Sequence, residues 1–383
     1  MNHLYSRLRT VCTVAALCAG ATLTHAADLV FGQIASTTNP ASASNAKGMV
    51  TGIQAYFDRV NAAGGVNGNK FKLQTLDDGL QAPKMVELTQ QLIADKSVIA
   101  MLGSLNSAGL AEVAKQNLPG SNGIALIAPH QGDKHIVSAE NVFPLRSGYA
   151  DEVHALLKEA KGWGKDTLAI VNMNIAFGPS VAEVATQLST VHGIKVISHQ
   201  VIDASPEQLD ASVKAAVAAV AEAKPKAILV LAAGKPAFEF IKAMRDAPGG
   251  QTQIYGVSVV LYDVLVKAVG VDKARGIVLS QAVPYPFIPN KPVIGEFQAD
   301  MKKFAPNEPT SFSALEGYLG AKIAVEAARR AGSNPTRASI VTALNNFGEY
   351  DLGGVFVRYS PGLHKGWGGV DLSIISATGT LRK

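Results

Sequence analysis

The stretch from Ile53 to Gly79 reads IQAYFDRVNAAGGVNGNKFKLQTLDDG, and the stretch from Val98 to Leu110 reads VIAMLGSLNSAGL. The apolar residues that open the first stretch recur at helical spacing and predict an amphipathic helix. That helix ends near Gly65, because glycine tolerates the left-handed conformation of a C-terminal cap. The second stretch predicts an apolar strand that breaks at Gly103 into another helix, whose free N–H groups suit a carboxylate.

Three segments carry a family resemblance: the helix ending in VNAAGGVNG, the following KLQTLDD, and the strand ending in GSLNS. They resemble the leucine/isoleucine/valine-binding protein family, which are periplasmic solute receptors of ABC importers. The resemblance implies an α/β fold of two doubly wound parallel-sheet lobes joined by three hinge crossings, the type I periplasmic binding protein fold. It also implies a small-molecule ligand between the lobes and an ABC permease of the inner membrane as partner.

The N-terminus has the features of a secretory signal peptide over residues 1–26. Arg7 and Arg9 form its basic part and Val11 to Ala21 its apolar part, before a small-residue cleavage site that ends at Ala26. We therefore expect the mature protein in the periplasm. The alternative is an uncleaved membrane anchor, although the apolar run is shorter than the roughly 20 apolar residues that a helix needs to span a bilayer.

Composition excludes several classes of function. The chain has 35 Lys and Arg against 30 Asp and Glu, and removing Arg7 and Arg9 leaves 33 against 30, too balanced for nucleic acid. Both cysteines, Cys12 and Cys18, lie in the leader, so the mature chain has no disulfide or thiol nucleophile. It also lacks the common phosphate-binding, serine-hydrolase and zinc motifs. We expect a monomeric binding protein with no cofactor that is not an enzyme.

Strands and helices alternate along two series, which predicts two parallel sheets covered by helices. The expected lobes are 27–144 plus 284–352, and 145–283 plus 353–383. The expected crossings are Asn141–Ser147, Gly276–Tyr285 and Gly353–Arg358, the last following from the resemblance.

Ser107 stands where the family's ligand-carboxylate serine stands, with Asn106 before it. The resemblance implies that the Ser107 hydroxyl and nearby helix N–H groups bind a carboxylate. The alternative is that Ser107 only caps its helix.

The segment after the next strand, APHQG, places His130, Gln131 and Gly132 in the expected cleft. The family usually has small or hydroxyl residues here, so His130 either donates to a ligand oxygen or closes the cleft wall. His130, Asp133 and His135 share one short loop without a fourth ligand, so we expect no metal site.

Phe177 matches an aromatic position of the family, where it either covers the ligand or packs in the core. Ser258 stands where the family's amino-acid binders carry an acid for the ligand ammonium. A buried, unpaired ammonium costs several kcal/mol. We therefore expect a small organic acid, an aromatic acid or an amino-acid-like ligand, and a standard α-amino acid only if another acid reaches it.

Arg146 and Tyr149 follow the first crossing. Arg146 either clamps an anionic group of the ligand or forms a hinge salt bridge. Weaker cleft candidates at strand ends are Gln33, Ser36, Thr37, Lys235, Gln281 and Tyr285. A ligand-sensing regulator of the same fold is the alternative function.

Overall fold

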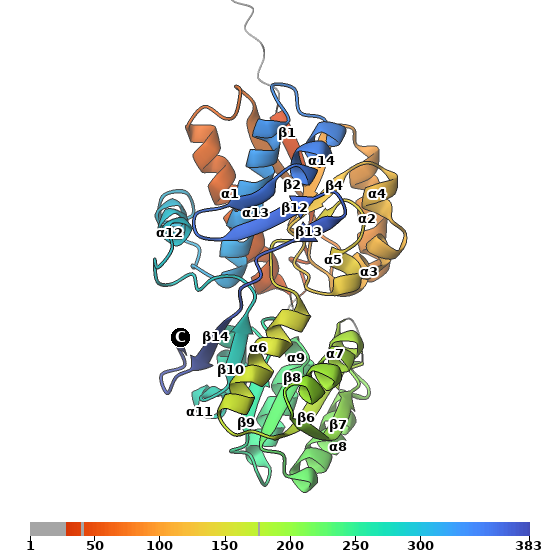
Figure 1. Cartoon of the computed structure of the whole chain (residues 1–383), viewed down its shortest axis with the longest axis vertical. Helices are drawn as coiled ribbons and strands as arrows, with labels where there is room; N and C mark the ends of the chain where they lie inside the picture. Colours follow the sequence, from red (N-terminus) through yellow and green to blue (C-terminus); the bar gives the residue numbers. More distant parts are fainter. Residues whose placement is uncertain (1–27, 40–41, 175–176) are drawn as a thin grey trace, which may run out of the picture.

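A computed structural model describes residues 28–39, 42–174 and 177–383. The chain forms two lobes stacked along its long axis, each with its own sheet and helices (Figure 1). This confirms the predicted α/β architecture of two parallel-sheet lobes. The predicted leader lies outside the described residues.

The N-terminal lobe contains a five-stranded sheet in the order β2-β1-β3-β4-β5, and every neighbouring pair is parallel. Its strands are β1 (Asp28–Ile34), β2 (Lys70–Leu76), β3 (Val98–Leu102), β4 (Ala125–Ile127) and β5 (Val142–Phe143). Phe31 packs into the core on one face and Ile34 into the core on the other. Burial on both faces explains why the central strands are almost entirely apolar.

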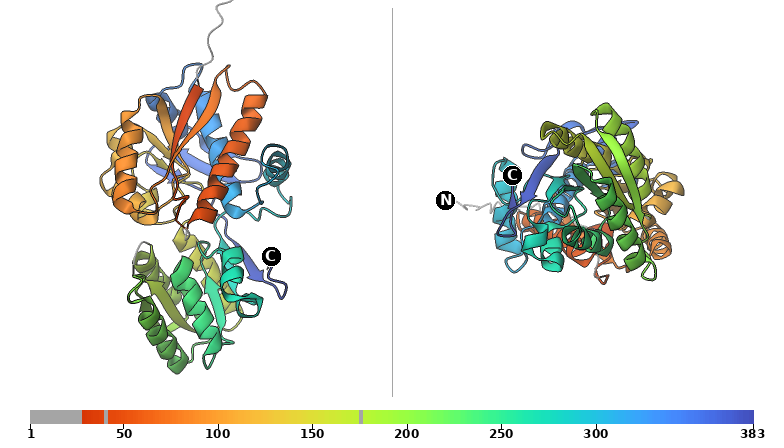
Figure 2. Two further views of the ribbon diagram at one scale, coloured as in Figure 1. Left: turned by 180° about the vertical axis from the view of Figure 1, so that it is seen from behind. Right: turned by 90° about the horizontal axis from the view of Figure 1, so that it is seen from below.

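Helices cover both faces of this sheet. On one face lie α1 (Ala43–Ala62), α12 (Pro292–Phe304), α13 (Phe312–Arg330) and α14 (Arg337–Asn345). On the other lie α2 (Ala82–Ala94), α3 (Ser107–Lys115), α4 (Leu118–Ser121) and α5 (Lys134–Val137). The view from behind shows α1 and α13 side by side against the sheet (Figure 2).

The C-terminal lobe contains a seven-stranded sheet in the order β15-β14-β10-β9-β8-β6-β7. The strands are β6 (Thr167–Met173), β7 (Lys195–Ile202), β8 (Ala227–Leu231), β9 (Gln253–Gly256), β10 (Val278–Gln281), β14 (Asp371–Ile375) and β15 (Leu381–Arg382). The helices are α6 (Tyr149–Gly162), α7 (Gly178–Val191), α8 (Leu209–Ala223), α9 (Gly234–Asp246), α10 (Tyr262–Val269) and α11 (Val271–Ala274). Strands β6 to β10 pair in parallel, whereas β14 and β15 add antiparallel pairs at one edge.

The third passage between the lobes comes later than expected. A small antiparallel sheet of β11 (Gly348–Asp351), β12 (Phe356–Ser360) and β13 (Leu363–Lys365) packs on the N-terminal lobe. Tyr359 is fully buried there, and its hydroxyl donates to the Pro144 carbonyl at 2.7 Å. The expected crossing at Gly353–Arg358 is therefore wrong, and the chain crosses between β13 and β14. The alternating pattern of β12 identifies a half-buried strand and does not identify its lobe.

The second passage also lies slightly later than the expected boundary at 283 and 284. Tyr285 and Phe287 still pack against the core of the C-terminal lobe, while Val293 in α12 belongs to the N-terminal core. The change of lobe falls between these two groups. The first passage follows β5 and precedes α6.

Arg337, at the start of α14, binds the carbonyl groups where α2 ends. Its guanidinium donates to Val98 at 2.8 Å, Ile93 at 2.9 Å and Asp95 at 2.6 Å. The last carbonyls of a helix have no intrahelical partner, and hydrogen bonds to a charged group are worth about 1.5–3 kcal/mol each. We expect Arg337→Ala to lower the free energy of unfolding by about 2 kcal/mol in urea denaturation.

Arg358→Ala is the matched control. Arg358 pairs with Glu349 at 2.7 Å, but both side chains are more than half exposed, at 58% and 57%. Exposed pairs contribute less than about 1 kcal/mol. Equal destabilisation by the two substitutions would contradict the role given to Arg337.

Candidate functional site

A cavity of about 560 Å³ lies between the two lobes, and we call it the cleft cavity. The N-terminal lobe contributes Asn39, Ser42, Asn45, Leu80, Leu105, Asn106, Ser107, Ala108 and His130. The C-terminal lobe contributes Met173, Phe177, Ala204, Pro206, Ala233, Gly234, Lys235, Pro236, Phe238, Val259, Leu261 and Val264. Both lobes therefore line one space, as expected of a ligand cleft.

Among the described residues, five helices begin at the cleft cavity. Asn45 lies in the first turn of α1 and Ser107 is the first residue of α3. Phe177 is the N-cap of α7, Gly234 is the first residue of α9, and Leu261 is the N-cap of α10. The N-terminus of a helix carries unpaired N–H groups and a partial positive charge. Five such ends, two from the N-terminal lobe and three from the C-terminal lobe, make the cavity suitable for an anion.

Asn106, and not Ser107, is the N-cap of α3. The Asn106 side chain accepts from the Gly109 N–H at 3.0 Å and donates to Asp78 at 2.7 Å. Its amide is therefore engaged inside the N-terminal lobe. The Ser107 hydroxyl lines the cavity and has no hydrogen-bond partner among the residues that the structure describes, which leaves it available to a ligand.

The wall of the C-terminal lobe is mainly apolar, with one cation. Lys235 is exposed in the first turn of α9. Phe177 is 3% exposed and stacks on Tyr149 with ring centroids 4.9 Å apart, so it is both a core residue and a cavity residue. Among the described lining residues no carboxylate is present. This composition suits an anionic group attached to an apolar body.

His130 joins the cleft cavity to a chain of buried polar groups that we call the hinge network: Glu316, His130, Arg146, Ser258 and Glu152. His130 Nδ1 lies 2.9 Å from Glu316 and 3.2 Å from Arg146 Nη1. Arg146 Nη2 donates to the Ser258 hydroxyl at 2.5 Å. The Ser258 N–H and hydroxyl in turn donate to Glu152 at 2.8 and 3.0 Å.

The hinge network connects α13 of one lobe with α6 of the other. Arg146 is 4% exposed, and its guanidinium is held by these contacts. Arg146 does not line the cleft cavity, and its contacts favour the hinge alternative over a ligand clamp. Ser258 is likewise engaged with two network members.

The pKa values of the two acids of the hinge network shift in opposite directions. Burial raises the pKa of Glu152, and the charge of Arg146 opposes that rise only in part. Burial would also raise the pKa of Glu316, but the charges of His130 and Arg146 outweigh it and hold the pKa below its usual value. Glu316 is therefore the ionised partner of His130 at neutral pH.

The other strong candidates lie off the cleft cavity. Gln131 is fully buried, and its side-chain oxygen accepts from the N–H groups of Gly132 and Asp133 at 2.8 and 2.9 Å. Gly132 accepts from the Tyr149 N–H at 3.0 Å. Gly132 and Tyr149 face a separate cavity of about 420 Å³ behind the first crossing.

Most of the weaker cleft candidates form hydrogen bonds within a lobe and do not line the cleft cavity. The side chain of Gln33 donates to the Gly103 carbonyl, Ser36 donates to Asp78, and Tyr285 donates to the Leu381 carbonyl. The Thr37 hydroxyl donates to Asp77. Lys235 is the weaker candidate that reaches the cleft cavity.

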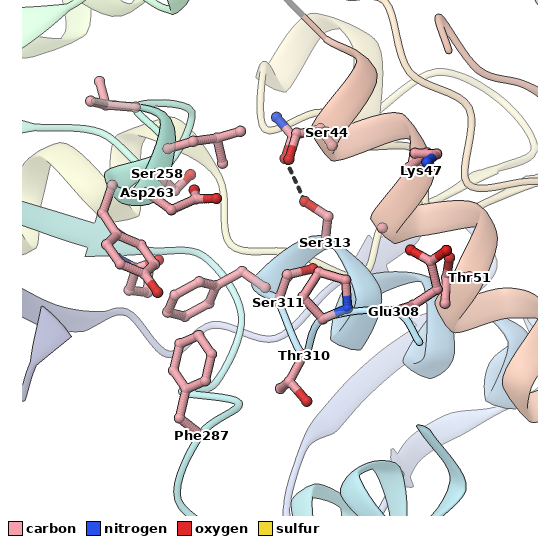
Figure 3. Close-up of a pocket in the computed structure, with 18 residues that line it drawn as sticks. Ser44, Lys47, Thr51, Ser258, Asp263, Phe287, Glu308, Thr310, Ser311 and Ser313 are labelled. Atoms are coloured by element: carbon pink, nitrogen blue, oxygen red, sulfur yellow. Dashed lines mark hydrogen bonds between the residues drawn. The ribbon is translucent and has the colours of Figure 1, made fainter. Parts of the chain in front are cut away.

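A second chamber of about 330 Å³ adjoins the cleft cavity, and the two share Asn45 and Leu261. Ser258, Gln281, Asp263 and Glu308 line it. In Figure 3, Ser258 and Asp263 lie on the side opposite Lys47 and Thr51 of α1. The dashed line marks the hydrogen bond from Ser313 to Asn45. The carboxylates of Asp263 and Glu308 therefore line this chamber and not the cleft cavity.

Sequence reasoning missed Asn45, Phe238 and both acids of the hinge network. The polar run before the first helix, from Thr37 to Asn45, was a usable signal, because such residues gather at helix starts. Glu316 lies in the mainly apolar first half of α13 and is 2% exposed. An acid within such an apolar stretch predicts a buried partner.

Comparison with known proteins shows the family of this chain. The periplasmic binding protein family model matches residues 29–370. The Leu/Ile/Val-binding protein BraC3 of Rhizobium johnstonii is 24% identical over 340 residues, covering 87% of this chain and 88% of that protein. In the described part of the chain, no helix combines the length and apolar character needed to cross a membrane.

Solved structures share the fold over nearly the whole chain. An extracellular ligand-binding receptor from Verminephrobacter eiseniae has a TM-score of 0.85 at 27% identity, covering 93% of this chain and 100% of its own. A fatty acid ABC transporter substrate-binding protein from Thermomonospora curvata has a TM-score of 0.79 at 20% identity, covering 92% and 89%. The chain belongs to the periplasmic binding protein family, a family of non-enzymatic binding proteins.

Proposed function

We propose that this protein binds a small carboxylate with an apolar body, an aliphatic or aromatic organic acid, in the cleft cavity. It acts in the periplasm and delivers the ligand to an ABC permease of the inner membrane. The observation that carries this proposal is the lining of the cleft cavity. Five helix N-termini, the Ser107 hydroxyl and Lys235 meet an apolar wall, and no described lining residue is an acid.

The energetics favour an acid over an amino acid. A charge near a helix N-terminus gains about 0.3–1 kcal/mol, and a charge-assisted hydrogen bond about 1.5–3 kcal/mol. Micromolar affinity requires about 8 kcal/mol in total. A ligand ammonium left unpaired beside Lys235 would cancel much of this gain, because burying an unpaired charge costs several kcal/mol.

A branched-chain α-amino acid is the second candidate. Asp263 lines the adjoining chamber and could pair with an ammonium group that reaches past Asn45 and Leu261. The relative BraC3 is named for binding leucine, isoleucine and valine. The neighbour from Thermomonospora is named for fatty acids, so the names of similar proteins cover both ligand classes.

Calorimetry with matched ligands separates the two candidates. 4-Methylpentanoate has the carbon skeleton of leucine without the ammonium group, and 3-phenylpropanoate corresponds in the same way to phenylalanine. We expect at least one acid to bind at micromolar concentration and its amino acid to bind about 100-fold more weakly, a difference of about 2.7 kcal/mol. The reverse order, abolished by Asp263→Asn, would replace the first proposal with the second.

Lys235→Met tests the anionic group of the ligand. Because Lys235 is exposed, its pairing with a carboxylate is worth about 1 kcal/mol, so calorimetry should show affinity falling about fivefold. Lys242→Met is the control, because Lys242 is exposed on the same helix and does not line the cleft cavity. Equal losses in both variants, or none in either, would contradict the role of Lys235.

A further inference from the structure

The second chamber differs from the cleft cavity in charge. Asp263 and Glu308 line the chamber together with one cation, Lys47, whereas Lys235 lines the cleft cavity and no described acid does. Within the described part of the chain, the charged groups of Asp263, Glu308 and Lys47 form no ion pair or hydrogen bond. The excess of carboxylate over cation makes the chamber suitable for a positively charged group.

Three aromatic rings line the chamber near Asp263. Phe287 is nearly perpendicular to Tyr262, at 86° with ring centroids 6.4 Å apart, and to Phe312, at 87° and 5.7 Å. Rings that meet edge to face turn their electron-rich faces in different directions. Such faces attract organic cations. Figure 3 shows Phe287 and Asp263 on the side of the chamber away from Lys47.

A buried amide gives the chamber a further polar group. Gln281 is the last residue of β10 and is 5% exposed, and its side chain has no hydrogen-bond partner among the residues that the structure describes. Neighbouring side chains of a strand point to opposite faces, and Ser280 donates to Glu152 of α6 at 2.6 Å. Gln281 therefore points away from α6 and lines the second chamber. Because a buried amide without a partner is unfavourable, it favours a ligand that supplies a hydrogen-bond donor.

We propose that the second chamber binds a small primary alkylammonium ion. The carboxylate of Asp263 pairs with its charge, the side-chain oxygen of Gln281 accepts one of its N–H groups, and the three rings pack against its alkyl chain. The chamber and the cleft cavity have two lining residues in common. The ammonium ion is therefore a second ligand, bound beside the carboxylate proposed for the cleft cavity and not in its place.

The test is calorimetry of the intact protein with n-butylammonium and with 1-butanol, which has the same alkyl chain and no charge. We expect butylammonium to bind with a Kd of about 0.1–1 mM and 1-butanol to bind at least about tenfold more weakly. Asp263→Asn should weaken butylammonium binding about tenfold. Phe287→Leu, which keeps an apolar side chain, should weaken it about threefold, as loss of a cation–π contact does.

Asp210→Asn is the matched control. Asp210 is also an acid in the first turn of a helix of the same lobe, but it is exposed and does not line the chamber, so binding should not change. Equal binding of butylammonium and 1-butanol would overturn this inference, and so would equal effects of the two aspartate substitutions. Asp263 has no polar partner to lose, so circular dichroism should show Asp263→Asn folded. If it is not, Phe287→Leu and the pair of probes still decide the matter.

A competition experiment separates the two cavities. The Kd of 4-methylpentanoate should not rise when the protein is saturated with butylammonium. A rise that follows the butylammonium concentration would show one shared site and overturn this inference. If butylammonium binds as expected and neither 4-methylpentanoate nor 3-phenylpropanoate binds, the proposed function is wrong and the role of the second chamber stands.

Discussion

Arg146→Met is expected to lower the free energy of unfolding by about 3–5 kcal/mol, because it leaves two buried acids without their counter-charge. Arg146 lies 3.9 Å from Glu316 and reaches Glu152 through Ser258. Glu152 is 0% exposed and Glu316 is 2% exposed, so water cannot replace the guanidinium. Urea denaturation followed by circular dichroism measures the loss.

The pH dependence of this loss identifies its cause. Arg146 lowers the pKa of both Glu152 and Glu316 in the folded protein. Removing it raises both folded-state pKa values, so the folded variant holds its protons to higher pH than the unfolded chain does. Stability relative to the parent should therefore recover as pH falls from 8 to 5.

A double variant provides the control. Adding Glu316→Gln to Arg146→Met removes one of the two uncompensated charges, and the pair should lose less than the sum of the single substitutions. Purely additive losses that do not change with pH would show that Arg146 acts through packing alone.

Gly52→Ala is expected to destabilise the protein by about 3 kcal/mol, as overpacking of a tight core does. A Cβ atom at this position would lie 1.8 Å from the Ala314 carbonyl oxygen of the neighbouring helix. Gly317 faces α1 in the same way, at 2.2 Å from the Met49 carbonyl oxygen. These obstacles are backbone atoms, so α1 and α13 must move apart. Thermal and urea denaturation both report the change.

Gly295→Ala is the matched control within α12. Its Cβ would meet only Pro289, at an ordinary 3.8 Å. Helix propensity then predicts a gain of up to about 1 kcal/mol. If the two substitutions had similar effects, close approach of α1 and α13 could not be the reason for glycine at position 52.

Local patterns in the sequence predicted most of the fold. The strand expected at Val98–Leu102 has those bounds as β3, and the glycines after α1 adopt the positive φ angles of a helix end, 101° at Gly64 and 81° at Gly65. Such features depend on near neighbours in the chain. The lobe that holds β12 depends on Tyr359 meeting Phe143, with ring centroids 5.4 Å apart, which no local pattern encodes.

The candidate site divides in the same way. The position of Ser107 at the cleft could be predicted, because strand ends and helix starts lie together at one edge of a parallel sheet. The role of Arg146 was open because its partners Ser258 and Glu316 lie far along the chain, 112 residues away in the first case. The sequence gives the chemical type of each side chain, but the tertiary fold determines which of several possible partners that side chain contacts.

The packing of α1 against α13 also determines how late in synthesis the N-terminal lobe can fold. The bond between Ser313 and Asn45 joins residues 268 positions apart, so the first lobe cannot close its core until most of the chain has been synthesised. Contacts of such long range slow folding. The N-terminal lobe therefore completes its core only after the segments on both sides of the C-terminal lobe have been made.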